Sequence, residues 1–299
     1  MRFFRRVCEN KRELPLVITK AKFQKEDVLI EALPYIQQFE HKTFVIKYGG
    51  AVMQDEELKA MVAQDVTLLR KIGINVVVVH GGGKEITSFS DKLNIKTKFI
   101  NGQRYTDEET RDVVQMVLVG LINKDIVRRI NINGGRAVGV SGIDAELVKV
   151  RKYDNEDLGF VGEVTDVNSS FVKNLLKDGY LPVIAPIGVD ENGTVYNVNA
   201  DIAAGSIAGA IDALKLVYMT DIEGVKINGE FVSHLTQTEV ENYIKRGIIN
   251  GGMIPKVKSA LDALESGVQK VHIIDGRIPH ALLLEIFTND GIGTEIVSK

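Results

Sequence analysis

Glycine-rich loops follow two short apolar segments of this chain of 299 residues. The segment 43–48 runs into Gly49 and Gly50, and the segment 74–80 runs into Gly81, Gly82 and Gly83. Because glycine has no Cβ, such loops can take a positive φ and bring backbone N–H groups against an anion. Neither loop has the G-x-x-x-x-G-K-[ST] or G-x-G-x-x-G spacing of the common nucleotide motifs. The loops therefore predict a phosphate site of another kind, with a plain tight turn as the alternative.

Two lysines and an aspartate could add the chemistry of phosphoryl transfer to these loops. Lys47 closes the first apolar segment, Asp201 follows the motif Asn197-Val198-Asn199-Ala200, and Lys256 ends the stretch 251–256. The transferring group carries charge on its oxygens, so catalysis is mostly positioning and electrostatic stabilisation. An aspartate between two lysines would keep them oriented and charged. In the alternative interpretation, Asn199 and Asp201 are helix caps and both lysines are solvated.

The surrounding sequence predicts an α/β fold that could position these groups. Apolar residues at helical spacing over 55–72 separate the two apolar segments, which makes a βαβ unit with both loops at the carboxyl edge of a sheet. Further helices are predicted near 107–130, 170–177, 201–211 and 251–264, strands at 137–140, 181–184, 214–219 and 271–274, and a hairpin over 147–164. This alternation favours a mostly parallel central sheet sandwiched by helices.

Composition excludes several classes of protein. The net charge of −3 gives no general attraction for nucleic acid or for acidic membrane surfaces. A single cysteine excludes an internal disulfide framework. The basic start of the chain is followed by polar residues in place of the apolar core of a signal peptide, so we expect a cytoplasmic protein, although an organelle transit peptide stays open.

Six motifs, in this order, resemble those of the amino acid kinase family, and within it the acetylglutamate kinases. They are Lys47-Tyr48-Gly49-Gly50, His80-Gly81-Gly82-Gly83, Asn101-Gly102-Gln103-Arg104, Asn197-Val198-Asn199-Ala200-Asp201, Thr220-Asp221 and Gly251-Gly252-Met253-Ile254-Pro255-Lys256. The resemblance covers nearly all of the chain from about 27 to 296. It implies the amino acid kinase fold with two lobes.

The resemblance also implies an activity: transfer of the γ-phosphoryl group of ATP, bound with Mg²⁺, to the side-chain carboxylate of N-acetyl-L-glutamate, the second step of arginine biosynthesis. In its motifs Lys47 and Lys256 stabilise the transition state and Asp201 organises them. The acceptor would be held by Gly81, Gly82, Arg104 and Asn197. Backbone N–H groups of Gly49, Gly50 and Gly83 would contact phosphate, and the nucleotide would lie along Thr220, Asp221, Gly251, Gly252 and Met253.

A carboxylate acceptor is already ionised at pH 7, so the reaction needs no general base. His80 is therefore interpreted as a packed or hydrogen-bonding residue. Two other functions stay open. One is another amino acid kinase, such as a carbamate, glutamate or uridylate kinase, and the other is a non-catalytic arginine sensor or scaffold with the same fold.

The resemblance is strongest to members that arginine inhibits, in which an N-terminal helix interlaces dimers into a hexamer. It implies an oligomerisation arm over 1–24, an acceptor-binding lobe over 25–212 and an ATP-binding lobe over 213–299. The arginine site would include His272, Glu285 and Gly291, and the assembly would be a homo-hexamer, a trimer of dimers. Whether a PII-type signalling protein binds is left open. Without the resemblance, His272 would be a core histidine and Glu285 a surface charge.

Overall fold

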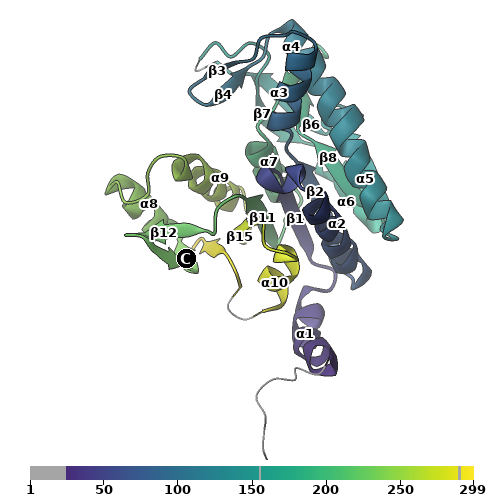
Figure 1. The fold of residues 1–299 in the computed structure, drawn as a ribbon, viewed down its shortest axis with the longest axis vertical. Coiled ribbons are helices and arrows are strands. Elements are labelled where there is room, and N and C mark those ends of the chain that lie inside the picture. Colours follow the sequence, from purple (N-terminus) through teal and green to yellow (C-terminus); the bar gives the residue numbers. More distant parts are fainter. Residues whose placement is uncertain (1–24, 155, 289–290) are drawn as a thin grey trace, which may run out of the picture.

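The computed structural model describes residues 25–154, 156–288 and 291–299 (Figure 1). The oligomerisation arm predicted over 1–24 lies outside these residues. None of the helices in the described ranges is both long enough and apolar enough to cross a bilayer.

An eight-stranded sheet forms the centre of the molecule, in the order β14-β16-β15-β11-β1-β2-β8-β5. In that order the strands are His234–Thr236, Thr294–Val297, Lys270–Asp275, Lys215–Thr220, Thr43–Tyr48, Asn75–His80, Leu181–Ala185 and Ala137–Ser141. The six strands from β15 to β5 run parallel, and β16 pairs with β15 in the antiparallel direction. The predicted mostly parallel sheet is confirmed.

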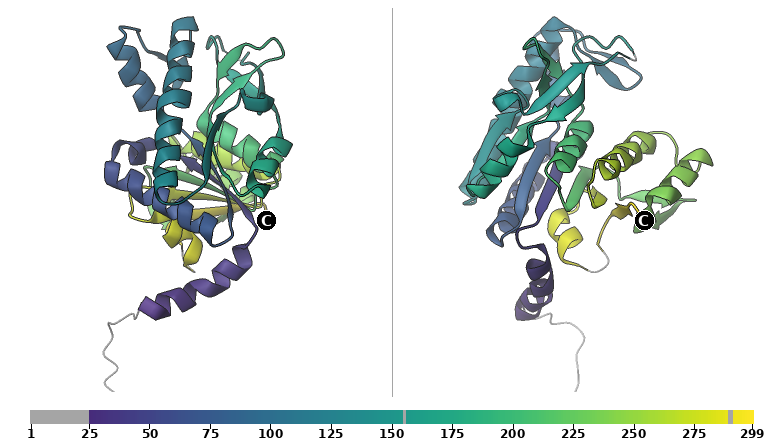
Figure 2. Two further views of the ribbon diagram at one scale, coloured as in Figure 1. Left: turned by 90° about the vertical axis from the view of Figure 1, so that its right-hand side faces the viewer. Right: turned by 180° about the vertical axis from the view of Figure 1, so that it is seen from behind.

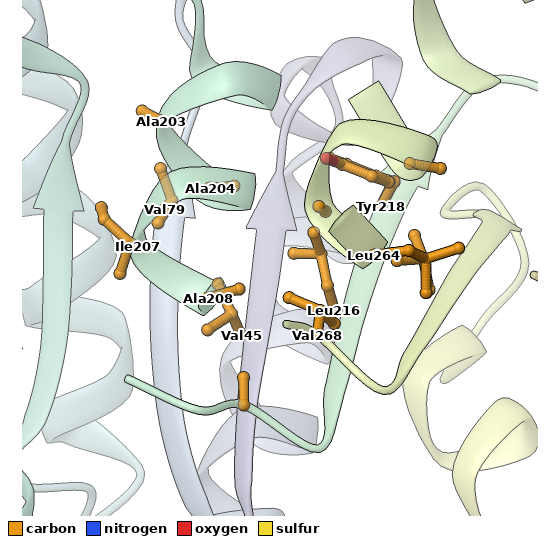
Figure 3. Packing of buried hydrophobic residues seen from close by; sticks show 14 of the residues in the cluster. Val45, Val79, Ala203, Ala204, Ile207, Ala208, Leu216, Tyr218, Leu264 and Val268 are labelled. Atoms are coloured by element: carbon orange, nitrogen blue, oxygen red, sulfur yellow. The ribbon is translucent and has the colours of Figure 1, made fainter. Parts of the chain in front are cut away.

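Helices cover both faces of this sheet. Alternate strand residues point to opposite sides, so Val45 and Leu216 pack in one core while Phe44 and Val217 pack in the other. Figure 3 shows the first core, where α7 lies on the strands. The helices of the described ranges are α1 Lys25–Phe39, α2 Glu56–Lys71, α3 Gly83–Lys92, α4 Glu108–Gln115, α5 Asn123–Ile132, α6 Ser169–Lys177, α7 Ala200–Ala210, α8 Gln237–Lys245, α9 Met253–Glu265 and α10 Ala281–Phe287.

The predicted βαβ unit is confirmed by the pairing of β1 with β2, with α2 between them in the chain. Gly81 N–H donates a 2.8 Å hydrogen bond to the carbonyl oxygen of Tyr48. This bond lies where the two strands end, so it holds the two glycine loops side by side. A short 3-10 helix, Gly50–Gln54, follows the first loop, and α3 follows the second.

Smaller sheets lie beyond the carboxyl edge of the central sheet. The four-stranded one has the order β10-β9-β6-β7, formed by Val195–Asn197, Ile187–Val189, Val148–Lys152 and Gly162–Val167. Its antiparallel pair β6 and β7 confirms the predicted hairpin. Two further hairpins are β3–β4, formed by Lys98–Ile100 and Gln103–Tyr105, and β12–β13, formed by Val225–Ile227 and Glu230–Val232. In Figure 1, α7 lies between a group formed by α3, α4 and β3–β4 and a group formed by α8, α9 and β12.

Helix α1 projects from the rest of the molecule (Figure 2). Its last turns contact the body through aromatic rings, with Tyr35 edge-on to Phe287 at 6.4 Å between ring centroids and Phe39 edge-on to Phe44 at 5.3 Å. Ile30 and Leu33 are exposed. The boundary between lobes at 212/213 stays a prediction. The strand that follows it, β11, pairs with β1, so the central sheet continues across this boundary.

Candidate active site

A cavity of about 280 Å³ opens at the carboxyl edge of β1 and β2. It is lined by glycines of the second loop, by the hairpin β3–β4 and by the start of α7. The predicted site residues that it brings together are Lys47, Gly81, Gly82, Gly83, Arg104, Asn197 and Asp201. Predicted residues from four separate parts of the sequence therefore face one space.

Lys47 and Asp201 form an ion pair in this cavity, with 2.7 Å between Nζ and Oδ1. Lys47 is 9% exposed, so it is not the solvated lysine of the alternative interpretation. Gly49 leaves room for its ammonium group, because a Cβ there would lie 3.0 Å from Nζ. The cap of α7 is Asn199, whose side chain accepts a 2.8 Å hydrogen bond from Asp201 N–H. The carboxylate of Asp201 therefore pairs with Lys47, while Asn199 caps the helix.

Arg104 presents an incompletely bonded guanidinium to the same cavity. Its Nη2 donates to Gly83 O at 2.7 Å and to Thr87 Oγ1 at 2.8 Å. Its Nη1 is buried and has no hydrogen-bond partner among the described residues. Burial lowers the pKa of the Arg104 guanidinium, which nevertheless remains a cation at neutral pH. A buried cation with a free donor can bind an anion, since leaving the charge and the donor unpaired costs free energy.

The hairpin that carries Arg104 has a tight turn at Asn101-Gly102. Both residues have positive φ, 48° and 80°, as the favoured two-residue hairpin turn requires. On the strand before the turn, the Phe99 ring lies 4.9 Å from the guanidinium carbon of Arg104 and also lines the cavity. The turn and the ring together set where the guanidinium points.

The buried ring of His80 contacts the second glycine loop. Its Nδ1 lies 2.8 Å from Gly81 O, and its Nε2 lies 3.3 Å from Nδ2 of Asn123. The side chain of Asn123 also donates to Val183 O at 2.9 Å. Burial lowers the pKa of His80 to about 4, so the ring is neutral at pH 7. With one nitrogen donating to Gly81 and the other accepting from Asn123, His80 is a hydrogen-bonding residue, as interpreted from the sequence.

The helix that packs against the second loop leaves no room for a side chain at Gly82. Between α4 and α5 the helical segment Met116–Ile122 is π-helical, and it brings Leu118 and Ile122 against the glycine. A Cβ at Gly82 would lie 2.4 Å from Cδ1 of Ile122 and 2.6 Å from Cδ2 of Leu118. The sequence predicted one helix here but gave no sign of this change in helix type, a feature that is frequent at functional sites.

A second cavity, of about 400 Å³, lies at the start of α9 and contains part of the predicted nucleotide site. Asp221 and Met253 line it, together with Asn250 and Arg277, which the sequence reasoning missed. Thr220 is buried beside it, and its Oγ1 accepts a 3.2 Å hydrogen bond from Ile222 N–H. The loop at Gly251 and Gly252 precedes α9 and is exposed. Lys256 is partly buried on the first turn of α9 and lines neither of these cavities.

The three residues predicted to bind arginine are close together. Nδ1 of His272 lies 2.5 Å from Oε1 of Glu285, and both are buried. Oε2 of Glu285 accepts hydrogen bonds from the N–H groups of Ile292 and Gly293, at 2.7 and 3.0 Å. Burial acts to raise the pKa of Glu285, but the interaction with His272, followed by the two backbone hydrogen bonds, outweighs it and holds the pKa below its usual value. Gly291 is adjacent, since a Cβ there would lie 2.9 Å from Oε2 of Glu285.

Much of the cavity wall was not predicted. Phe99, Val161 and Pro186 line it, and they come from short segments without a clear periodic pattern. Phe99 lies two residues before the Asn101-Gly102 turn, which is the one sequence signal that could have located it.

Comparisons with known proteins identify the family of this fold. The model of the amino acid kinase family matches residues 42–275. The chain belongs to the amino acid kinase family.

Its relatives within that family include curated acetylglutamate kinases. The one from Chlorobaculum parvum is 55% identical over 271 residues, which is 90% of each chain. The one from Aquifex aeolicus is 54% identical and covers 91% of this chain and 97% of the relative. At this similarity over nearly the whole length, the chain is a kinase.

Solved structures show the same fold. N-acetylglutamate synthase from Neisseria gonorrhoeae, complexed with coenzyme A and N-acetyl-glutamate, has a TM-score of 0.82 at 25% identity. The match covers 92% of this chain and 64% of the synthase chain. Carbamate kinase from Giardia lamblia bound to AMP-PNP has a TM-score of 0.66 at 17% identity, which supports the fold alone.

Proposed function

We propose that this chain transfers the γ-phosphoryl group of ATP to the side-chain carboxylate of N-acetyl-L-glutamate, a step of arginine biosynthesis. The observation that carries the proposal is the free Nη1 of Arg104 in the cavity that also holds the Lys47–Asp201 pair. An acceptor with a carboxylate at each end fits this arrangement. Arg104 would take the α-carboxylate in a bidentate grip, and the side-chain carboxylate would face Lys47. The names of the relatives support the choice of acceptor.

In the reaction, an oxygen of the side-chain carboxylate attacks the γ-phosphorus, and the bond from that phosphorus to the bridging oxygen of ADP breaks. No proton is taken from the acceptor, because the carboxylate is ionised at pH 7. Lys47 and Lys256 would balance the charge on the phosphoryl oxygens, and Asp201 holds Lys47 in place. Backbone N–H groups of Gly49, Gly50 and Gly83 would add hydrogen bonds to phosphate.

ATP would enter with Mg²⁺ and occupy the cavity beside α9. That cavity is lined by Asp221 and Met253, and the loop at Gly251 and Gly252 borders it. Arg277 lines the same cavity, held by Asp275 through a 2.7 Å contact between Nη2 and Oδ2. The first turn of α9, which carries Lys256, would then border the nucleotide.

The test is an acceptor assay. The protein is incubated with Mg-ATP and N-acetyl-L-glutamate, and the acyl phosphate is trapped with hydroxylamine. Parallel reactions contain free glutamate, carbamate or UMP, and ADP release is measured in all of them because a product such as UDP gives no hydroxamate. We expect hydroxamate with N-acetyl-L-glutamate, at a rate at least a hundredfold above that with free glutamate. Turnover with one of the other acceptors but not with N-acetyl-L-glutamate would reject the proposal in favour of another amino acid kinase.

We also propose that arginine inhibits the enzyme at His272, Glu285 and Gly291. The support is that these residues lie together in the structure, and that α10, which carries Glu285, contacts α1. The homo-hexamer and any PII-type partner belong to the same proposal, with 1–24 as the oligomerisation arm. Deleting 1–24 should reduce a hexamer to a dimer and weaken inhibition by arginine, measured by sedimentation and by the acceptor assay. A truncated chain that still sediments as a hexamer contradicts the role of the arm.

A further inference from the structure

Tyr218 lies on β11 beside Lys47 of β1 and lines neither cavity. It is the neighbour of Lys47 in the register of β11 and β1, so the two side chains leave the sheet on the same face. It is 2% exposed, and burial raises the pKa of its hydroxyl well above the usual value. Figure 3 shows Tyr218 among the apolar side chains of this core. A tyrosine in a buried apolar strand reads from sequence as core alone.

The hydroxyl of Tyr218 links the two helices that carry the charged groups. Its oxygen lies 3.2 Å from the carbonyl oxygen of Asp201, on the first turn of α7. It lies 3.3 Å from the carbonyl oxygen of Ser259, one helical turn beyond Lys256 on α9. A hydroxyl carries one proton, so that proton is shared between the two carbonyls. The bond therefore depends on the separation of the two helices.

Small residues bring the helices close enough for this link. A Cβ at Gly205 of α7 would lie 3.4 Å from Cβ of Ala263 on α9 and 3.5 Å from the Tyr218 hydroxyl. Farther along, a Cβ at Gly209 would lie 2.6 Å from the carbonyl oxygen of Ser266. The far ends of the helices are thus fixed by direct backbone contact, and the tyrosine hydroxyl bridges them nearer the charged groups.

We propose that Tyr218 is a positioning residue for phosphoryl transfer, which sets the distance between Asp201 with its partner Lys47 and the first turn of α9 with Lys256. The proposal rests on the proposed function. Oriented groups contribute to the rate only when they are held near their productive geometry. Since Tyr218 lines neither cavity, its hydroxyl acts on the chemical step and leaves substrate binding to other residues.

The test is Tyr218→Phe, which removes one oxygen and keeps the ring in its core. We expect kcat to fall about tenfold, and the KM values for ATP and for N-acetyl-L-glutamate to change less than twofold. We also expect faster hydrogen exchange of the backbone in the first turns of α7 and α9. The matched control is Tyr196→Phe, because Tyr196 is also buried and its hydroxyl bonds Asp190 at 3.3 Å, outside the cavities. Its kcat should stay within twofold of the original.

The outcomes separate the two proposals. If the unmodified protein forms no acyl phosphate with N-acetyl-L-glutamate, the proposed function is wrong, and so is the positioning role of Tyr218 that rests on it. If the unmodified protein is active and Tyr218→Phe keeps its kcat, the role of Tyr218 alone is wrong. A fall in kcat accompanied by an equal rise in both KM values, or matched by Tyr196→Phe, indicates general loosening and also rejects the positioning role.

Discussion

Nζ of Lys47 on β1 lies 2.7 Å from Oδ1 of Asp201 on α7, at the point where a strand end and a helix start meet above the sheet. Both side chains are mostly buried, at 11% and 23% exposure, so the pair is less screened by solvent than an ion pair on the surface. The pairing fixes the ammonium group at the edge of the acceptor cavity.

Asp201→Asn keeps the shape of the side chain and removes its charge. We expect kcat to fall between about tenfold and a hundredfold, because Lys47 is no longer held by a carboxylate, while the melting temperature changes little since Asn199 still caps α7. Steady-state kinetics and thermal unfolding measure both. The control is Asp212→Asn, which breaks an exposed pair with Lys173 just beyond the other end of α7. Equal kcat values for the two variants contradict the role of Asp201.

Arg104→Lys tests the anion receptor. Lysine keeps the positive charge but lacks the planar fork that can bind Gly83 and a carboxylate together. We expect KM for N-acetyl-L-glutamate to rise at least tenfold, with KM for ATP unchanged. Initial rates at varied concentrations of each substrate check this. An unchanged KM for the acceptor shows that the free Nη1 has another purpose.

Gly82→Ala tests the packing of the glycine loop. The added methyl group would meet Ile122 and Leu118, so the loop or the π-helical segment must shift. We expect a loss of about 1–3 kcal/mol in the free energy of unfolding, typical of overpacking, and a higher KM for the acceptor. Gly120→Ala is the control, because a Cβ there meets nothing within 4 Å. If Gly82→Ala is as stable and active as the control, the loop is less constrained than the structure indicates.

The pH dependence of stability should carry the signature of His80. Burial lowers its pKa from 6.5 to about 4, so between these values the unfolded chain binds a proton that the folded chain does not. The contribution of His80 is complete above pH 6.5 and is lost as the pH falls towards 4, a loss of up to about 3 kcal/mol. The stability advantage over His80→Asn, from denaturant titrations at several pH values, should shrink accordingly.

The sequence predicted the parts of the fold that depend on long periodic segments. The strands before the two glycine loops, the helix α2 and the βαβ connection are where 43–80 indicated. The hairpins β3–β4 and β12–β13 have strands of three residues, too short for a period to be read, and were not predicted. Lys47 and Asp201 could be named as partners, but their contact depends on how α7 packs on the sheet.

Two features of the site could not be read from the sequence for a similar reason. Gly83 and Thr87 accept hydrogen bonds from Nη2 of Arg104, while Nη1 stays free. Both facts depend on the tertiary structure. Tyr218 looks like any apolar strand residue until α7 and α9 are placed on either side of its hydroxyl. Residue types thus indicated the chemistry, and the packing of helices on the sheet assigned the partners.

The central claim is that Lys47 and Lys256 stabilise the migrating phosphoryl group, and a single-turnover measurement tests it most directly. Enzyme in excess over radiolabelled Mg-ATP is mixed with saturating N-acetyl-L-glutamate and quenched on the millisecond scale. We predict that Lys47→Ala and Lys256→Ala each slow the chemical step at least a hundredfold, about 2.7 kcal/mol in barrier, with ATP binding within a few-fold of the original. Lys177→Ala, at an exposed position at the end of α6, should match the unmodified protein. A chemical step of normal rate in both active-site variants would contradict the account.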